Sequence, residues 1–312
     1  MKVAVFGAGG VGGLFGGKLA RSGVDVCFIS RGAHLEALQA SGLRVASVHG
    51  DFELAPVVAT SNPAEAGPAD YVLVAVKSYH TGQVAAELGP LLHENTAVIS
   101  LQNGIDNEEK LAAAAGHGRV AGGAAYIFAQ ITQPGVIEHT GGPAAIVVGE
   151  WSGPRSGRLD RLVGACQSAG FKAEQSSDIR ATLWTKFAFI CALAGTTAAV
   201  RLPIGEIRTA PAARDLFRKV AAEVCEVARA EGISLPADLP DRHLALADSV
   251  EAGSYSSLYH DLDRSGATEL EALLGEVTRR GARAGVSVPM SEALYAVLQP
   301  WDLRSTRSKD TA

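Results

Sequence analysis

The chain has 312 residues, of which 47% are hydrophobic and 20% charged, and its 33 acidic against 28 basic side chains give a formal net charge of −5. This length predicts two domains, since a single hydrophobic core rarely serves more than about 250–300 residues. The sequence has no patch rich in Lys and Arg, which argues against nucleic acid or a membrane as partner and favours a small molecule.

Cysteines and histidines give no sign of a metal or disulfide framework. The cysteines lie far apart in apolar settings and are expected to be buried reduced thiols, and the histidines form no HxxxH or HExxH spacing, so no metal site is predicted. At the N-terminus "VAVF" stops at a glycine cluster, so it predicts a strand and no signal peptide. We therefore expect a cytoplasmic protein.

Strands and helices alternate through the first part of the chain, which predicts βαβ units, a parallel sheet and an α/β fold of the Rossmann type. From about Arg119 the pattern changes to hairpin strands that extend the sheet, with turn signals at 133–135 and 141–143. Predicted strands are 2–6, 25–30, 71–76, 96–101 and 171–175, and predicted helices are 11–22, one from 33, 82–92, 107–115 and 155–169.

Beyond Ser176 only helical patterns follow, so we predict a first domain over 1–175 and an all-helical second domain over 176–312. The helices are expected at 178–199, 211–232, 240–249, 254–264, 269–284 and 291–298.

The stretch "GAGGVG" follows the first predicted strand and opens a helix, which is the context that a GxGxxG pattern requires. Gly7 permits the tight turn, Gly9 lets the backbone approach a pyrophosphate, and Gly12 lets the helix pack on the strand. The phosphate would lie at the helix N-terminus, beside Gly10 and Val11. A glycine turn without a ligand is the plainer alternative, but this placement favours a dinucleotide site.

The second strand ends in Ser30-Arg31 instead of the acidic residue that would bind a ribose 2′-hydroxyl. A guanidinium at this place matches a 2′-phosphate through charge-assisted hydrogen bonds, and Ser30 adds a hydroxyl. The pair therefore favours NADP(H) over NAD(H), with a solvated loop arginine as the alternative.

Two more candidate residues follow the strands at 71–76 and 96–101, where open α/β sheets bind their ligands. Lys77 comes directly after the first of these strands and Asn103-Gly104 after the second. A solvated lysine and a plain Asn-Gly turn are the alternatives.

The stretch "WTKFAFICALAGTTAAVR" places Lys186 at the head of an apolar run of about fourteen residues, against the roughly 20 that cross a bilayer. The run therefore predicts a buried helix. Its lysine is either a snorkelling helix-end residue or a working group that faces a cavity.

Taken together, these motifs resemble the ketopantoate reductase family, also called the 2-dehydropantoate 2-reductases. The resemblance rests on "VAVFGAGGVGGLFGGKLARSG", "SRGAHLEAL", "VKSY", "LQNGID", "WTKF" and "SSLYHDLDRSGATELEALLG" followed by "GVSVPMSEALYAVL", and it covers essentially the whole chain. It implies a Rossmann domain, an all-helical domain and an active site in the cleft between them. The implied reaction is NADPH-dependent reduction of a 2-oxo acid to a 2-hydroxy acid, 2-dehydropantoate to pantoate in pantothenate and coenzyme A biosynthesis.

The resemblance implies two catalytic residues. Lys186 falls on the lysine that hydrogen-bonds the substrate carbonyl and supplies the proton, which is chemically apt because an ammonium stabilises a developing alkoxide. Glu269 falls on the glutamate that contacts the substrate hydroxyl, with an acid favouring a helix N-terminus as the alternative.

The resemblance also implies binding residues. Asn103 falls on the asparagine that positions nicotinamide and substrate, Lys77 on a lysine near the cofactor, and Arg31 on the 2′-phosphate arginine. Ser257 falls on a serine that contacts the substrate carboxylate, and Asp261 lies one turn further along the same helix.

At two positions the chain departs from the family pattern. Ile190 and Ala194 share a helix face with Lys186, where we associate the ketopantoate enzymes with substrate-binding asparagines. A buried hydroxyl that loses its partner costs about 1–3 kcal/mol. A more apolar 2-oxo acid is therefore an alternative substrate, and a non-catalytic NADP(H)-binding protein is a second alternative. The apolar helices also allow a homodimer through the second domain.

Overall fold

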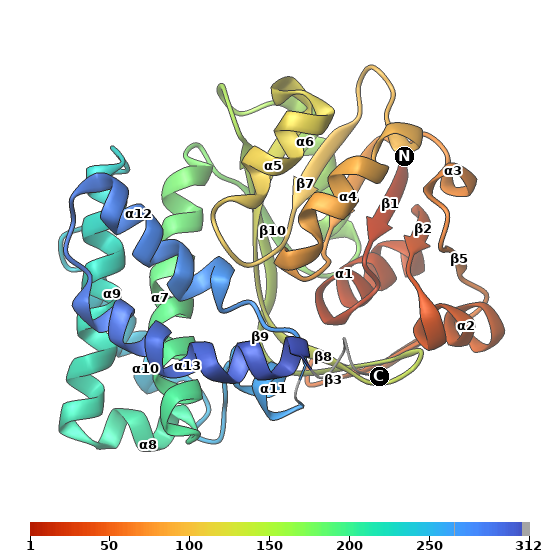
Figure 1. Ribbon diagram of the computed structural model, residues 1–312. Coiled ribbons are helices and arrows are strands. Elements are labelled where there is room, and N and C mark those ends of the chain that lie inside the picture. The colour runs from red at the N-terminus through yellow and green to blue at the C-terminus, as the bar shows by residue number, and fades with distance from the viewer. Residues whose placement is uncertain (265, 308–312) are drawn as a thin grey trace. The chain divides into compact units, whose positions relative to one another are not determined.

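The computed structural model describes residues 1–264 and 266–307. Contacts between Cα atoms divide the chain into two compact units (Figure 1). The first unit holds residues 1–102 and 106–179, and the second holds residues 103–105 together with the chain from Arg180 onward.

The first unit is built on one mixed sheet, which has ten strands within the described residues, in the order β4-β3-β9-β8-β7-β6-β1-β2-β5, with β10 beside β9. The strands from β5 to β8 pair in parallel, and β8 and β9 form an antiparallel hairpin. The strands are β1 (Lys2–Phe6), β2 (Asp25–Ile29), β3 (Leu43–Ser47), β4 (Phe52–Leu54), β5 (Val58–Thr60), β6 (Tyr71–Val74), β7 (Ala97–Ser100), β8 (Val120–Gln133), β9 (Val136–Glu150) and β10 (Lys172–Gln175).

The β8–β9 hairpin differs from the sequence prediction. The turn signal at Gln133-Pro134-Gly135 is a turn, but the one predicted at 141–143 is wrong, because β9 continues through it. Gly142 takes a left-handed φ of +82° inside the strand, and the register with β8 shifts on both sides of Phe128. A glycine pair thus marks an irregularity in a long strand, which a glycine signal in sequence does not distinguish from a turn.

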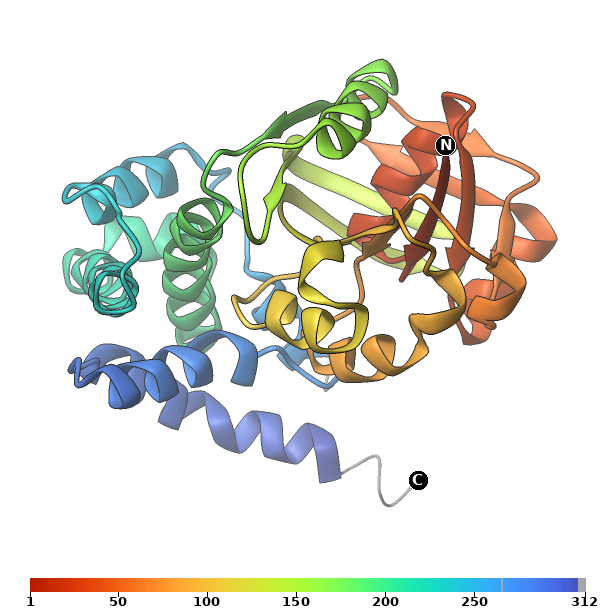
Figure 2. The ribbon, with the colours of Figure 1, turned by 90° about the horizontal axis from the view of Figure 1, so that it is seen from above.

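Helix α1 (Gly10–Arg21) is enclosed by this sheet. It contacts β1 and β2 near one end of the strand order and β3, β4, β8 and β9 toward the other, so the sheet curls round it. Figure 2 shows α1, in red, beside the long strands of the hairpin. The other helical segments of the unit are α2 (Gly32–Ser41), α3 (Pro63–Ala66), η1 (Ser78–His80), α4 (Thr81–Glu87), η2 (Gly89–Leu91), α5 (Asn107–Ala115), η3 (His117–Arg119) and α6 (Gly157–Ser168).

The second unit packs its helices round α7 (Ile179–Val200). Phe189 of α7 meets Phe217 and His243 at ring-centroid distances of 5.9 and 5.7 Å, and Trp184 lies under Arg280. The surrounding segments are α8 (Ile204–Thr209), α9 (Pro211–Ala230), α10 (Leu239–Ser249), α11 (Ser257–Asp263), the π-helical turn η4 (Glu271–Gly275), α12 (Glu276–Ala284) and α13 (Pro289–Arg307). Of these, α8 and the π-turn were not predicted, and α13 is longer than its predicted span.

Helix α7 is long and apolar enough to cross a membrane by length and composition, and it is the one such helix among the described residues. However, 72% of its most apolar window is buried inside the protein. Burial of this extent is typical of the core helix of an α-helical unit, which agrees with the prediction of a buried helix.

Candidate active site

The glycine loop between β1 and α1 has the geometry that its sequence predicts. Gly7 has a φ of +99°, and a Cβ there would lie 2.8 Å from Val76. A Cβ on Gly12 would lie 2.0 Å from the carbonyl oxygen of Gly7. The turn therefore requires glycine at both positions.

The other side of the loop is open. A Cβ on Gly9 would meet no protein atom within 4 Å, and Gly9 is the N-cap of α1, whose first turn carries no acidic residue. Helix N-termini attract anions through their unpaired N–H groups and dipole, so this space fits the pyrophosphate of a dinucleotide. Gly10 faces the opposite way, since its Cβ would lie 2.3 Å from the carbonyl oxygen of Ala129 in β8, and Val11 packs partly buried against the core.

His34, which sequence reasoning missed, ties the glycine loop to two other segments. Its Nε2 lies 2.9 Å from the carbonyl oxygen of Ala8, and the backbone N–H of Gly135 donates to its Nδ1 at 3.1 Å. A carbonyl accepts and an N–H donates, so the ring is neutral with its proton on Nε2. Burial lowers the pKa of His34, which also favours the neutral ring. The hydrogen bond to the Ala8 carbonyl raises the pKa but offsets only part of this effect.

Arg31 follows β2, as predicted, and Ser30, which the predicted strand included, is the first residue after β2. The N–H of Ser30 donates to the carbonyl of Thr60, which extends the pairing of β2 with β5 by one residue. Nη2 of Arg31 lies 2.7 Å from Oε1 and 2.9 Å from Oε2 of Glu87, at the end of α4. Nothing in the sequence pattern pointed to this carboxylate.

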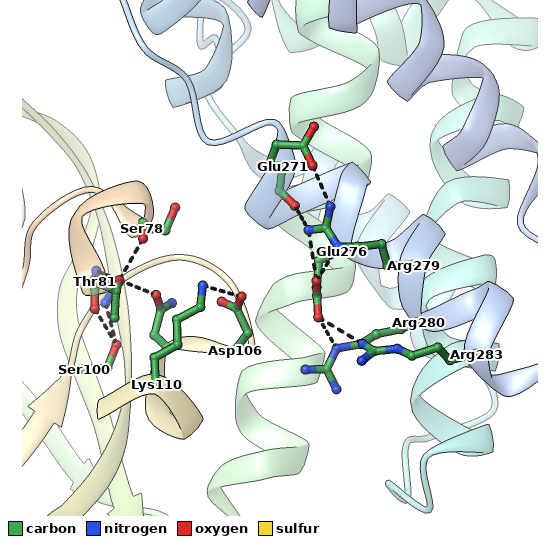
Figure 3. A network of polar contacts seen from close by, with 12 residues as sticks. Ser78, Thr81, Ser100, Asp106, Lys110, Glu271, Glu276, Arg279, Arg280 and Arg283 are labelled. Atoms are coloured by element: carbon green, nitrogen blue, oxygen red, sulfur yellow. Dashed lines mark hydrogen bonds and ion pairs between the residues drawn. The ribbon is translucent and has the colours of Figure 1, made fainter. Parts of the chain in front are cut away.

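Lys77 and the Asn103 loop follow β6 and β7, and a buried network ties the segments behind them. Nε2 of Gln102 donates to Oγ1 of Thr81 at 2.7 Å, and the Thr81 hydroxyl lies 2.8 Å from both the Ser78 carbonyl and Oδ1 of Asn107 (Figure 3). Lys77 is half-buried, next to Ser78. Hydrogen-bonded buried networks of this kind hold loops in one conformation.

In the second unit, Lys186 and Asn103 meet directly. Nζ of Lys186, which is half-buried on α7, donates to Oδ1 of Asn103 at 3.0 Å. Gly104 supports this loop with a φ of +103°. An ammonium has three donors, and this bond to an amide oxygen fixes the direction of one of them.

The face of α7 that carries Lys186 becomes apolar along the helix and then polar again. Ile190 is half-buried and Ala194 is 2% exposed, at four and eight residues from the lysine. Thr197, eleven residues along, returns to the same face and donates to Oγ of Ser256 at 2.8 Å. The face of α7 that carries Lys186 therefore has aliphatic side chains at the two positions where the resemblance led us to associate asparagines with the family.

Glu269 is buried, with 4% of its surface exposed, in the turn that leads into the π-helical segment. Hydrogen bonds to α13 flank it on both sides: Thr268 donates to Oδ1 of Asp302, and Tyr295 donates to Oε1 of Glu271, each at 2.5 Å. Figure 3 shows Glu271 paired with Arg279, at 2.5 Å.

The two remaining candidate residues lie on α11. Ser257 is exposed in its first turn and Asp261 is half-buried one turn later. The buried serine is Ser256, the N-cap of the helix, whose hydroxyl accepts from the N–H of Tyr259. Ser256 and Thr197 were missed, although an N-cap serine before "LYHDLD" is a signal that sequence reasoning can use.

Within the described part of the chain, no group of three or more His, Cys, Asp and Glu side chains is placed to hold a metal ion. The four cysteines are free and buried.

Comparisons with known proteins assign the family. The model "Ketopantoate reductase PanE/ApbA" matches residues 3–153, and its C-terminal counterpart matches residues 178–301. The chain belongs to the ketopantoate reductase family. It is therefore a dinucleotide-dependent oxidoreductase that acts on CH–OH groups.

Relatives within the ketopantoate reductase family cover nearly the whole chain. A 2-dehydropantoate 2-reductase of Archaeoglobus fulgidus is 33% identical and covers 96% of this chain and 97% of its own. An uncharacterized oxidoreductase of Bacillus subtilis, YkpB, is 34% identical over 97% and 99%. The crystal structure of a 2-dehydropantoate 2-reductase from Geobacter metallireducens matches with a TM-score of 0.91 at 31% identity, covering 96% and 99%.

Proposed function

We propose that this protein reduces a 2-oxo acid to a 2-hydroxy acid with NADPH, and that 2-dehydropantoate, which gives pantoate, is the first substrate to test. Two relatives that are named 2-dehydropantoate 2-reductase support this choice of substrate. The observation that carries the chemistry is the half-buried Lys186 ammonium, which lies on a largely apolar helix and donates to the Asn103 amide.

In the proposed reaction a bound dinucleotide supplies the hydride for the carbonyl carbon. Lys186 aims an N–H at the carbonyl oxygen, stabilises the negative charge that develops there and then gives up a proton to it. Asn103 accepts one of the other lysine N–H bonds and so fixes the direction of the ammonium. Glu269 accepts a hydrogen bond from the substrate hydroxyl, and Ser257 and Asp261 are proposed to contact the polar end of the substrate.

The proposed cofactor is NADP(H). Gly7, Gly9, Gly10, Val11 and Gly12 would hold the pyrophosphate, and Lys77 would lie near the cofactor. Arg31 and Ser30 would bind the 2′-phosphate, because a guanidinium offers several donors to phosphate oxygens. The tight turn at Gly7 and the open side of Gly9 support this assignment.

Ile190 and Ala194 favour a second candidate substrate, a 2-oxo acid with a branched apolar tail. Aliphatic side chains beside the lysine provide no hydrogen bond to a hydroxylated tail, and leaving a buried hydroxyl unpaired costs about 1–3 kcal/mol. The same residues would favour an apolar tail by burying it.

A panel of 2-oxo acids tests both candidates, with NADPH consumption followed optically. Under the first proposal 2-dehydropantoate has the highest kcat/KM; a branched apolar oxo acid turning over far better would replace it. Lys186→Ala should lower kcat by about 10²–10⁴-fold, while NADPH still binds. If turnover survives this substitution, Lys186 is not the proton donor. If the wild type reduces none of the oxo acids, a non-catalytic NADP(H)-binding role gains support.

We also propose a homodimer through the helical unit. Support comes from α13, where Val297 and Trp301 leave 57% and 46% of their surface exposed one turn apart. Sedimentation of the wild type and of Val297→Asp tests this, since the charged variant should be monomeric.

A further inference from the structure

We propose that Glu87 sets how strongly this protein prefers NADP(H) to NAD(H). The inference rests on the proposed role of Arg31 at the 2′-phosphate. It begins with the contact between Arg31 and Glu87, which lie 56 residues apart in sequence but in the same unit.

The contact occupies one corner of the guanidinium. Nη2 of Arg31 reaches both carboxylate oxygens of Glu87, at 2.7 and 2.9 Å. The pairing therefore uses Nη2, the nitrogen that belongs to both donor edges of a guanidinium, Nε–Nη2 and Nη1–Nη2. A phosphate that bound either edge would meet the carboxylate at this nitrogen and share the guanidinium with it.

A neighbouring side chain holds Glu87 in place, although Glu87 does not stabilise its own helix. Nε2 of Gln83, one turn earlier on α4, donates to Oε1 of Glu87 at 3.1 Å. Glu87 is the last residue of α4, where a negative charge opposes the helix dipole. Its side chain is 28% exposed, against 52% for Arg31, so it is the less solvated member of the pair.

This geometry weakens NADPH binding more than NADH binding. A ribose 2′-phosphate carries a charge of about −1.5 to −2 near neutral pH, so a carboxylate on the same guanidinium repels it and offsets part of the attraction of Arg31. A 2′-hydroxyl carries no charge and can donate to a carboxylate, as it does to the acid of NAD-binding sites. Glu87 thus reduces the preference for NADP(H) over NAD(H) that Arg31 creates.

Glu87→Gln is the direct test, because the amide oxygen can still accept from Arg31 while the charge is lost. Kd values for NADPH and NADH, measured by fluorescence titration without substrate, should show NADPH bound about three- to tenfold more tightly and NADH no more tightly than by the wild type. The gain should shrink at high salt, as expected of an electrostatic effect. Glu87→Asp, which keeps the charge, should retain the wild-type ratio of the two Kd values.

Glu53→Gln is a matched control, since Glu53 forms a surface ion pair with Arg44 and its substitution changes the net charge equally. Arg31→Ala separates the inference from the proposal beneath it. If Arg31→Ala weakens NADPH but Glu87→Gln leaves the ratio of Kd values as in the control, the role of Glu87 is refuted. If Arg31→Ala leaves the NADPH-to-NADH ratio unchanged, the NADP(H) assignment fails first.

Discussion

Single side chains in the first unit hold loops that the sequence identifies only by their ends. Thr81 is completely buried, and its hydroxyl joins Gln102, which precedes Asn103, to Asn107 and to the segment after Lys77. Neither the residue type nor its spacing marks this threonine, because a hydroxyl network is defined by partners from three segments of the chain.

Thr81→Val should lower the free energy of unfolding by about 2–3 kcal/mol, because it removes the partner of two buried groups without changing the volume. Thr81→Ser keeps the hydroxyl and serves as the control. Urea unfolding of both variants checks this; a loss in Thr81→Val no larger than the loss in Thr81→Ser would contradict the role of the hydroxyl.

Arg31 shows how far residue-level prediction reaches. Its place after β2 followed from strand periodicity and the absence of an acid, whereas Glu87 is distant in sequence and was invisible. Likewise the glycine loop was read from its motif, but His34 was not, because its two partners are backbone groups that the sequence does not distinguish.

Among the elements, α13 stands out because it reaches the Glu269 turn at two points. The bond from Thr268 to Asp302 precedes Glu269, and the bond from Tyr295 to Glu271 follows it. Between Leu270 and Gly275 the N–H···O bond spans five residues instead of four, at 3.0 Å. An extra residue in a turn rotates what precedes it by about 100° relative to the rest of the helix, so the direction of Glu269 depends on this π-turn.

Tyr295→Phe combined with Asp302→Ala should therefore lower kcat about ten- to a hundredfold, with the Kd of NADPH unchanged, because the Glu269 carboxylate loses its alignment. Steady-state kinetics and cofactor titration check both halves. Asp215→Asn, in an exposed pair on α9, is the control. An unchanged kcat in the double variant would show that the turn keeps its geometry without α13.

Element prediction succeeded where one hydrophobic period ran uninterrupted and failed where it was broken or short. The periods gave α5 and α9 almost to the residue. The strands β4 and β5 have only three residues each, too few to establish an alternation, and were missed together with the five-residue β3. The π-turn was absorbed into a predicted helix because its sequence, "EALLG", has ordinary helical composition.

For the molecule as a whole, the buried histidines make the folded protein less stable as the pH falls. Burial lowers the pKa values of His34 and His139, and lowers that of His243 to about 4 from 6.5. His243 is 4% exposed, and within the described residues its Nδ1 has no hydrogen-bond partner. At acidic pH these histidines therefore bind protons in the unfolded chain that they do not bind in the folded protein.

The contribution of His243 to stability is complete above about pH 6.5 and is lost as the pH falls toward about 4, by about 3 kcal/mol in total. Replacing it with Phe, which resembles its aromatic neighbour Phe189, should flatten this part of the pH profile. Urea unfolding from pH 4 to 8 tests this against His117→Phe at an exposed site. Parallel profiles for wild type and His243→Phe would rule His243 out.

The contact of Gly10 with β8 limits how the nucleotide-binding motif can be reused. The glycine loop has no room for a side chain toward the Ala129 carbonyl, and His34 ties the same loop to the hairpin turn at Gly135. A transplant of only the first strand, the loop and the helix into another protein would lack the β8–β9 hairpin against which the loop packs. The smallest portable module therefore includes residues 120–150, and insertions in that hairpin should be selected against as strictly as changes in the motif itself.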